Sequence, residues 1–194
     1  MPRQVNHETR RQELAQAVWA LIRTGGIEHV TLRHLADATG WSTGAIRHYL
    51  PTREAILAFA AQHVSDRVNA RIEHTDVSGP PRTQLRAILH QFLPLDEERT
   101  LEAGIWLAFV AQGQATPQLA DTQGVAFDAL HAAFHDGLWT LQRRNLLTPG
   151  ADPTTEALAL HALLDGLTLH LLMRKLTPEQ ATGTLDAHLA RLVP

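Results

Sequence analysis

One stretch of this chain, residues 30–57, constrains its fold more than any other: VTLRHLADATGWSTGAIRHYLPTREAIL. Thr31 can cap the start of a helix, because its hydroxyl accepts hydrogen bonds from free backbone N–H groups. Gly40 can end that helix in the left-handed conformation, and Ser42 can cap a second, short helix that Pro51 stops. Two helices joined by a tight turn form a helix-turn-helix motif, whose second helix lies in the DNA major groove.

The second helix of this motif, residues 43–49, carries side chains suited to DNA. Small residues at its start let the backbone approach base edges, while guanidinium, imidazole and phenol groups bind phosphate oxygens, and arginine also reads guanine. By spacing alone, an ordinary helical hairpin is an equal alternative. The residues that we expect to contact DNA are Thr31, Arg33, Ser42, Thr43, Gly44, Arg47, His48, Tyr49 and Arg53.

The same stretch resembles the DNA-binding domain of the TetR/AcrR family of bacterial repressors. Two positions depart from the family pattern. Arg47 stands where the family usually has an aromatic residue, and Leu50 stands where it usually has phenylalanine. Leu50 is a core exchange, whereas Arg47 adds a cation beside the surface expected to face DNA. The matching residues are Ala17, Ile22, Gly26, Thr31, Leu35, Ala36, Gly40, Ser42, Gly44, Ile46, His48, Tyr49, Pro51, Arg53, Glu54 and Leu57.

Helical periodicity recurs along the whole chain and few residues favour strands, so we predict an all-α fold. With 194 residues the chain is long enough for one large or two small domains. We expect a three-helix DNA-binding domain over residues 1–54 and a helical ligand-binding and dimerisation domain over residues 55–194. The resemblance implies that a helix over residues 53–74 connects the two. Gly79-Pro80-Pro81 is the clearest linker after it.

The charges are shared unevenly along the chain. Residues 1–54 hold seven arginines against five acidic residues, whereas the remainder holds ten basic residues against fifteen acidic ones. A mildly basic segment on an acidic chain is typical of a local DNA-binding face and argues against a nonspecific nucleic-acid coat. The chain has no cysteine, no apolar run long enough for a membrane span and no leader pattern at its start, so we expect a cytoplasmic protein without a membrane partner.

Beyond residue 74 the periodicity predicts five or six further helices. Pro94 stops the first of them, and Pro117 starts a short turn before the longest one. The segments DEERTLEAGIWLAFVAQG and LHALLDGLTLHLLM are similar to the C-terminal domain of the BetI-like branch of the family. This similarity is looser than that of the DNA-binding domain expected over residues 1–54. Including the first helix of the chain, the expected ranges are 8–24, 83–93, 97–114, 122–147, 154–175 and 177–192.

The segment 157–173 is apolar nearly all round, which is typical of a helix enclosed on most sides. A core helix and a dimer-interface helix both fit. The resemblance implies a homodimer through the last two long helices of each subunit, which we take as residues 126–147 and 154–175. A palindromic operator also requires two DNA-binding domains, one from each subunit of a dimer. The residues expected at this interface are Trp139, His161, Asp165, Gly166 and Leu169.

The resemblance also implies a small-molecule pocket in the body, and therefore a repressor that an effector releases from double-stranded operator DNA. The branch similarity implies choline only as one member of a chemically diverse group of effectors. For each expected lining residue, a place in the core is the competing interpretation. The expected lining residues are His90, Trp106, Phe109, Phe127, His131 and His170.

Other functions find little support in the sequence. His131 and His135 are four residues apart, with Asp128 one turn earlier, and His161 and Asp165 form a second pair with the same spacing. Zinc hydrolases with this spacing carry a glutamate between the two metal ligands, and neither pair has one. Neither a G-x-S-x-G nucleophile turn nor a phosphate-binding glycine loop is present. We therefore expect no catalytic residue, metal site or cofactor. A ligand-independent or partner-gated DNA-binding protein and a helical metal-dependent enzyme are the alternatives.

Overall fold

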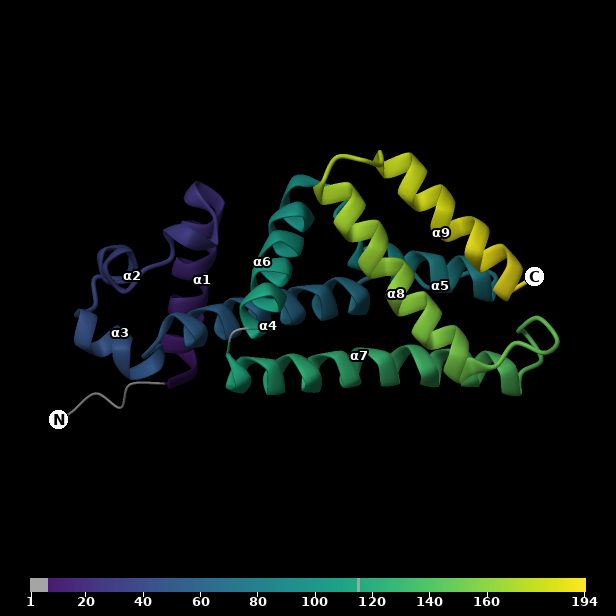
Figure 1. Ribbon diagram of the computed structural model, residues 1–194, viewed down its shortest axis with the longest axis horizontal. Helices are drawn as coiled ribbons and strands as arrows, with labels where there is room; N and C mark the ends of the chain where they lie inside the picture. Colours follow the sequence, from purple (N-terminus) through teal and green to yellow (C-terminus); the bar gives the residue numbers. More distant parts are fainter. Residues whose placement is uncertain (1–6, 115) are drawn as a thin grey trace. The chain divides into compact units, whose positions relative to one another are not determined.

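The computed structural model describes residues 7–114 and 116–194, and within them every regular element is a helix. The predicted all-α fold is confirmed (Figure 1). None of the helices in these ranges combines the length and apolar character needed to cross a bilayer. The elements are α1 (His7–Gly25), η1 (Ile27–His29), α2 (Leu32–Thr39), α3 (Thr43–Tyr49), α4 (Arg53–Glu73), α5 (Pro81–Leu89), η2 (His90–Phe92), α6 (Glu97–Gly113), α7 (Pro117–Arg143), α8 (Pro153–Leu172) and α9 (Pro178–Leu192).

The described residues divide into two compact units. Unit 1 comprises Met1–Asp66 with Gly104–Ala120, and unit 2 comprises Arg67–Ala103 with Asp121–Pro194, each in its described part. Helices α4, α6 and α7 therefore contribute residues to both units. The domain boundary expected at residue 54 stays a prediction, because this division follows packing rather than function.

Local capping explains where the helices of unit 1 begin and end. The Thr31 hydroxyl accepts a hydrogen bond from the backbone N–H of His34 at 3.2 Å at the start of α2. Gly40 ends α2 with φ 71°, a left-handed conformation that glycine adopts without strain. Thr52 caps α4 by accepting from the Ala55 N–H at 3.1 Å. The caps expected at Thr31 and Gly40 are confirmed.

Unit 1 buries one apolar side of each of its helices. Leu14 of α1, Leu35 of α2 and Ile46 of α3 have no measurable exposure. A second group joins α4 to the part of α6 and α7 that belongs to this unit, and it consists of Leu57, Ala61, Phe109 and Leu119. Burial of such side chains from several helices fixes the short helices α2 and α3, which could not persist alone.

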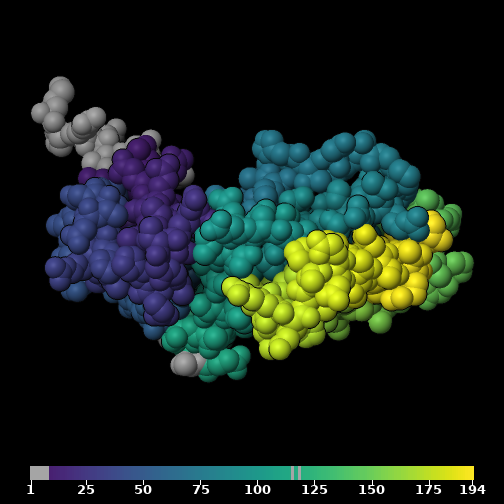
Figure 2. Space-filling model, turned by 90° about the horizontal axis from the view of Figure 1, so that it is seen from above, coloured from purple at the N-terminus to yellow at the C-terminus, as the bar shows by residue number. Residues whose placement is uncertain are grey.

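Unit 2 has a core shared by α5, α7, α8 and α9. Leu89, Leu138, Leu160 and Leu185, one from each of these helices, are fully buried in it. Helix α9 begins with a reciprocal capping box between Thr177 and its third helical residue, as the Thr-Pro start of this helix suggests. Figure 2 shows α9, in yellow, at the surface of this unit.

The bounds of α5 and α7 differ most from the sequence-based expectation. Pro117 does not start a turn before the long helix but is the first residue of α7, which runs for 27 residues. Proline is tolerated at a first helical position, because its missing N–H has no partner there in any helix. The helix expected over residues 83–93 is α5, which starts at Pro81 for the same reason and ends at Leu89, followed by the single 3-10 turn η2.

Candidate DNA-binding surface

Helix α3 is held in place from within unit 1. The Ser42 Oγ accepts a hydrogen bond from the Ala45 N–H at 3.1 Å, which caps the helix. Ile46 anchors its inner side and is fully buried, and Leu50 directly after it is 3% exposed. A helix of this length gains its stability from these anchors rather than from its own backbone hydrogen bonds.

The outer side of α3 is open to solvent. Thr43, Gly44, Arg47 and His48 are all exposed. A Cβ added to Gly44 would meet only the Ser42 Oγ, at 3.8 Å, so packing inside the unit does not require a glycine there. Glycine costs a helix roughly 0.5–1 kcal/mol relative to alanine. This favours a role for Gly44 on the outside, where another molecule can come close to the backbone.

A row of rings and one guanidinium connects α1 to both ends of α3. Arg10 lies over the ring of Trp41 at 5.0 Å from its centroid. The Trp41 ring lies 5.7 Å from that of Tyr49, which meets the His48 ring edge-on at 5.4 Å. Trp41 was not among the expected site residues. An indole in the turn of the motif, directly before the cap Ser42, is the feature that could have indicated it.

Helix α2 presents its first turn to solvent through Arg33, which is exposed. His34 lies on the other side of this turn, where its Nδ1 is 2.7 Å from the backbone oxygen of His29. The two imidazole rings stack at 4.2 Å between centroids. Arg33 therefore keeps the accessibility that a phosphate contact requires, whereas His34 and His29 organise the approach to α2.

Arg53, the first residue of α4, lies against the segment that precedes α2. Its Nη1 donates to the backbone oxygens of Ile27 at 3.0 Å and Val30 at 2.9 Å. Its Nη2 forms an ion pair with Glu28 at 2.9 Å. The side chain is 33% exposed, so it reaches solvent on one side only.

The residues expected to line a pocket fall in both units. Trp106 and Phe109 belong to unit 1, where their ring centroids are 5.6 Å apart and Phe109 is 2% exposed. The other four belong to unit 2, in which His90 is half-buried and His170 is exposed. Burial lowers the pKa of His90, and the neighbouring Arg86 lowers it further. The lining role of all six stays a prediction.

Unit 2 contains a group of stacked rings from α7 and α8. Phe127 lies parallel to His161 at 4.5 Å and to His131 at 5.9 Å, and the Phe134 ring meets His161 edge-on at 5.6 Å. The Nδ1 atoms of His131 and His161 are buried, and neither has a hydrogen-bond partner among the described residues. Burial lowers the pKa of His161, the charge of Asp165 partly offsets this, and His131 adds to it.

The residues expected at a dimer interface differ in exposure. Trp139 and Leu169 are 44% and 42% exposed, large values for apolar side chains. Asp165 is exposed and Gly166 is half-buried, whereas His161 is only 4% exposed within its own subunit. Most of this set is therefore available to a partner, and His161 is committed to the ring group described above.

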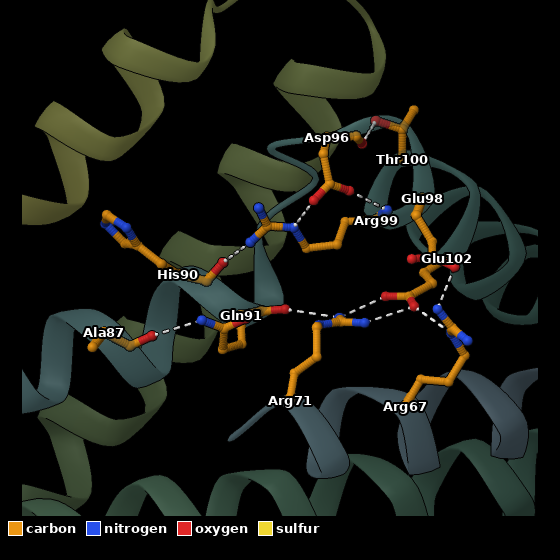
Figure 3. A network of polar contacts seen from close by, with 10 residues as sticks. All are labelled: Arg67, Arg71, Ala87, His90, Gln91, Asp96, Glu98, Arg99, Thr100 and Glu102. Carbon is orange, nitrogen blue, oxygen red and sulfur yellow. Dashed lines mark hydrogen bonds and ion pairs between the residues drawn. The ribbon is translucent and has the colours of Figure 1, made fainter. Parts of the chain in front are cut away.

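Acidic and basic side chains join α4 to α6 within unit 2 (Figure 3). Both Arg67 and Arg71 of α4 bind the carboxylate of Glu102, and Arg67 also pairs with Glu98. Arg99 donates to the backbone oxygen of His90 at 2.9 Å. This network was not among the expectations from the sequence. Glutamate within the largely apolar run of α6 is the pattern that could have indicated it.

Comparisons with known proteins agree with this geometry. Residues 81–194 match the family model of the BetI-type transcriptional repressor, C-terminal region. The HTH-type transcriptional regulator PksA of Bacillus subtilis (strain 168) is 34% identical over 174 residues, which cover 89% of this chain and 83% of PksA. This chain belongs to the TetR family. The BetI regulator of Stenotrophomonas maltophilia is 26% identical over 87% of the chain and 84% of its own length.

Solved structures show the same fold for the TetR-family chain. A transcriptional regulator from Rhodococcus sp. RHA1 superposes with a TM-score of 0.76 at 28% identity, covering 95% of this chain and 99% of that one. A regulator from Saccharomonospora viridis in complex with choline gives a TM-score of 0.75 at 22% identity, covering 97% and 100%. The chain is thus a helix-turn-helix transcriptional regulator and not an enzyme. Within the described residues, no three His, Asp or Glu side chains are placed to hold a metal ion.

Proposed function

We propose that this regulator is a repressor that binds a palindromic DNA operator as a homodimer and leaves it when a small molecule binds. The outer face of α3 carries this proposal. Thr43, Gly44, Arg47 and His48 are exposed together on a helix that is capped and anchored from within unit 1. Such a face suits the major groove, with Arg47 reading bases and His48 and Tyr49 binding phosphates. Thr31, Arg33 and Ser42 would contribute phosphate contacts from the same motif.

Exposed apolar side chains support the homodimer. The large apolar residues that are at least 40% exposed here are Val125, Phe127 and Trp139 on α7, Leu158 and Leu169 on α8, and Met173, the C-cap of α8. Large exposed apolar side chains on two helices of one unit are candidates for burial against another chain. Helix α9, by contrast, turns Ala181, Leu185, Leu189 and Leu192 into the core. A second copy of the chain packed on α7 and α8 would cover the exposed apolar residues there and would supply the second DNA-binding domain.

The course of α4 supports a response to an effector. This helix begins at Arg53 in unit 1 and ends at Glu73 in unit 2. A molecule that changes the packing of unit 2 can therefore act on the DNA-binding helices through one continuous element. The choline-bound regulator of Saccharomonospora viridis supports a small organic effector. Coupling of this kind is typically about 1–3 kcal/mol, or 5–150-fold in affinity.

The direct test starts from DNA alone. The wild-type protein would select duplexes from a random pool, and the selected sites are expected to be palindromes with half-sites about 34–36 Å apart or a multiple of this spacing. Affinity should fall steeply with salt concentration. Compounds that raise the melting temperature would then be titrated against the protein with and without the selected duplex. Since linkage is reciprocal, DNA must weaken the binding of a true effector. Equal affinities in the two titrations would favour a ligand-independent regulator.

A further inference from the structure

The guanidinium of Arg53 binds three groups inside unit 1. Two of the five N–H groups of its guanidinium donate to the backbone oxygens of Ile27 and Val30, and Nη2 forms an ion pair with Glu28. Its positive charge is already balanced by Glu28, whose side chain is 86% exposed. A phosphate oxygen approaching Arg53 would have to compete with this acid.

The Val30 backbone oxygen depends on this partner, and the Ile27 oxygen gains a second donor from it. Val30 is fully buried, and its carbonyl precedes the cap Thr31, so the hydrogen bonds of α2 do not reach it. The Ile27 oxygen already accepts from the Val30 N–H at 3.2 Å, and Arg53 adds a second, charged donor. A buried carbonyl without a donor is costly, which is why the two bonds from one guanidinium stabilise this segment.

The position of Arg53 in its helix strengthens the same conclusion. It is the first residue of α4, where the helix dipole is positive and a cation is unfavourable. The side chain relieves this by turning toward two carbonyl oxygens and a carboxylate. The contact is therefore specific to the arginine fork, since a single ammonium group cannot reach the same three acceptors with the same geometry.

Arg53 joins the start of α2 to the start of α4, and these two helices precede and follow α3, the proposed recognition helix, along the chain. Val30 leads directly into α2, and α4 follows α3 after Leu50, Pro51 and Thr52. We propose that Arg53 is a positioning residue for DNA binding, whose guanidinium fixes the start of α2 against the start of α4 and so holds α3 at the angle that enters the groove. This differs from the direct phosphate contact expected from the sequence, and it rests on the operator binding proposed above.

The test compares two replacements of the same side chain. Arg53→Lys keeps the positive charge but loses the fork, and Arg53→Gln loses both. If Arg53 positions α3, both variants should bind the duplex selected by the wild-type protein at least about tenfold more weakly, as the loss of a base contact would. The slope of log affinity against log salt should stay at the wild-type value in both. Binding to a random duplex should change less than binding to the selected one.

A second measurement does not depend on DNA. In the free protein, hydrogen exchange of residues 27–35 should become faster in both Arg53 variants, while exchange of α9 stays unchanged. This control also shows that unit 2 remains folded. Arg33→Gln is the matched contrast, because Arg33 is exposed: it should weaken both duplexes alike and lower the salt slope by about one.

The outcomes separate the two roles. Arg53→Lys could bind like the wild type while Arg53→Gln binds more weakly and its slope of log affinity against log salt becomes smaller in magnitude by about one. In that case Arg53 is a phosphate contact and the proposal fails. Unchanged exchange at residues 27–35 in both variants would also overturn it. Should the wild-type protein select no sequence from the pool, the operator proposal itself fails, which is a different result from either of these.

Discussion

Arg71 and Glu102 meet through two parallel hydrogen bonds, from Nη1 to Oε1 at 2.7 Å and from Nη2 to Oε2 at 2.6 Å. The side chain of Glu102 is only 4% exposed, and Arg67 donates from Nε to the same carboxylate at 2.8 Å. Arg71 also holds the Gln91 backbone oxygen at 3.2 Å. Because α4 carries both arginines and α6 carries the glutamate, this contact fixes the two helices to each other within unit 2.

Replacing Glu102 by glutamine should destabilise the protein strongly. Removing the carboxylate from a buried ion pair leaves the charge of Arg71 uncompensated, while Arg67 keeps Glu98, and such a loss typically costs about 3–5 kcal/mol. The free energy of unfolding from urea titrations measures this cost. Glu98→Gln is the matched control, because Glu98 pairs with Arg67 and its side chain is 50% exposed, so its loss should cost at most about 1 kcal/mol. Equal costs for the two variants would show that burial of Glu102 has no energetic consequence.

The cap of the recognition helix gives a second prediction. Ser42→Ala removes the acceptor for the Ala45 N–H and should lower the free energy of unfolding by about 1 kcal/mol. Ser42→Asn keeps a capping oxygen at the same position and should be nearly neutral. Thermal unfolding of the two variants beside the wild type measures the difference. If asparagine destabilised the protein as much as alanine does, the role of Ser42 would lie elsewhere than in capping.

Local features of the fold could be predicted from the sequence because their causes are local. Thr31, Gly40, Ser42 and Thr52 act within a few residues of their own positions, and the structure shows each boundary where the capping chemistry puts it. The predicted start of α7 was wrong because a proline is compatible with a turn as well as with the first position of a helix. Only packing decides between them: the neighbouring Leu119 is buried, which favours the helix.

Contacts between distant residues could not be predicted in this way. Arg53 was expected to face DNA because it matches a family position, but nothing near it in sequence shows that the Ile27 and Val30 oxygens are within reach. The same holds for Arg10 over Trp41, whose positions are brought together by α1 and the turn before α3. Side-chain partners of this kind depend on tertiary packing, which a sequence pattern does not contain.

Acidification should destabilise unit 2 through His161. Burial lowers the pKa of this imidazole from its ordinary value of 6.5, and the charge of Asp165 offsets only part of this shift. The unfolded chain therefore binds protons more readily than the folded one, so the stability is present above pH 6.5 and is lost as the pH falls below it. Burial lowers the pKa of His90 and His188 in the same direction.

The measurement for His161 is the melting temperature between about pH 7.5 and 5.5. His161→Phe keeps an aromatic ring against Phe127 and cannot take up a proton, so its melting temperature should fall less with acid than that of the wild type. A residual fall is expected from His90 and His188. Identical pH profiles for the variant and the wild type would exclude His161 as a source of the acid sensitivity.

The last prediction tests the proposed homodimer at Gly166 of α8. A Cβ added there meets no atom within 4 Å in the single subunit, so packing within the subunit does not require a glycine at this position. If α7 and α8 pack against a second copy, Gly166→Leu should overpack the helix crossing and weaken association by about 1–3 kcal/mol. Gly183→Leu is the matched control, since a Cβ added to Gly183 also meets no atom within 4 Å, and Gly183 lies on α9 rather than on α7 or α8. Sedimentation equilibrium gives the association constants. A dimer that is unaffected by Gly166→Leu, but dissociated by Gly183→Leu, would place the interface on α9 instead.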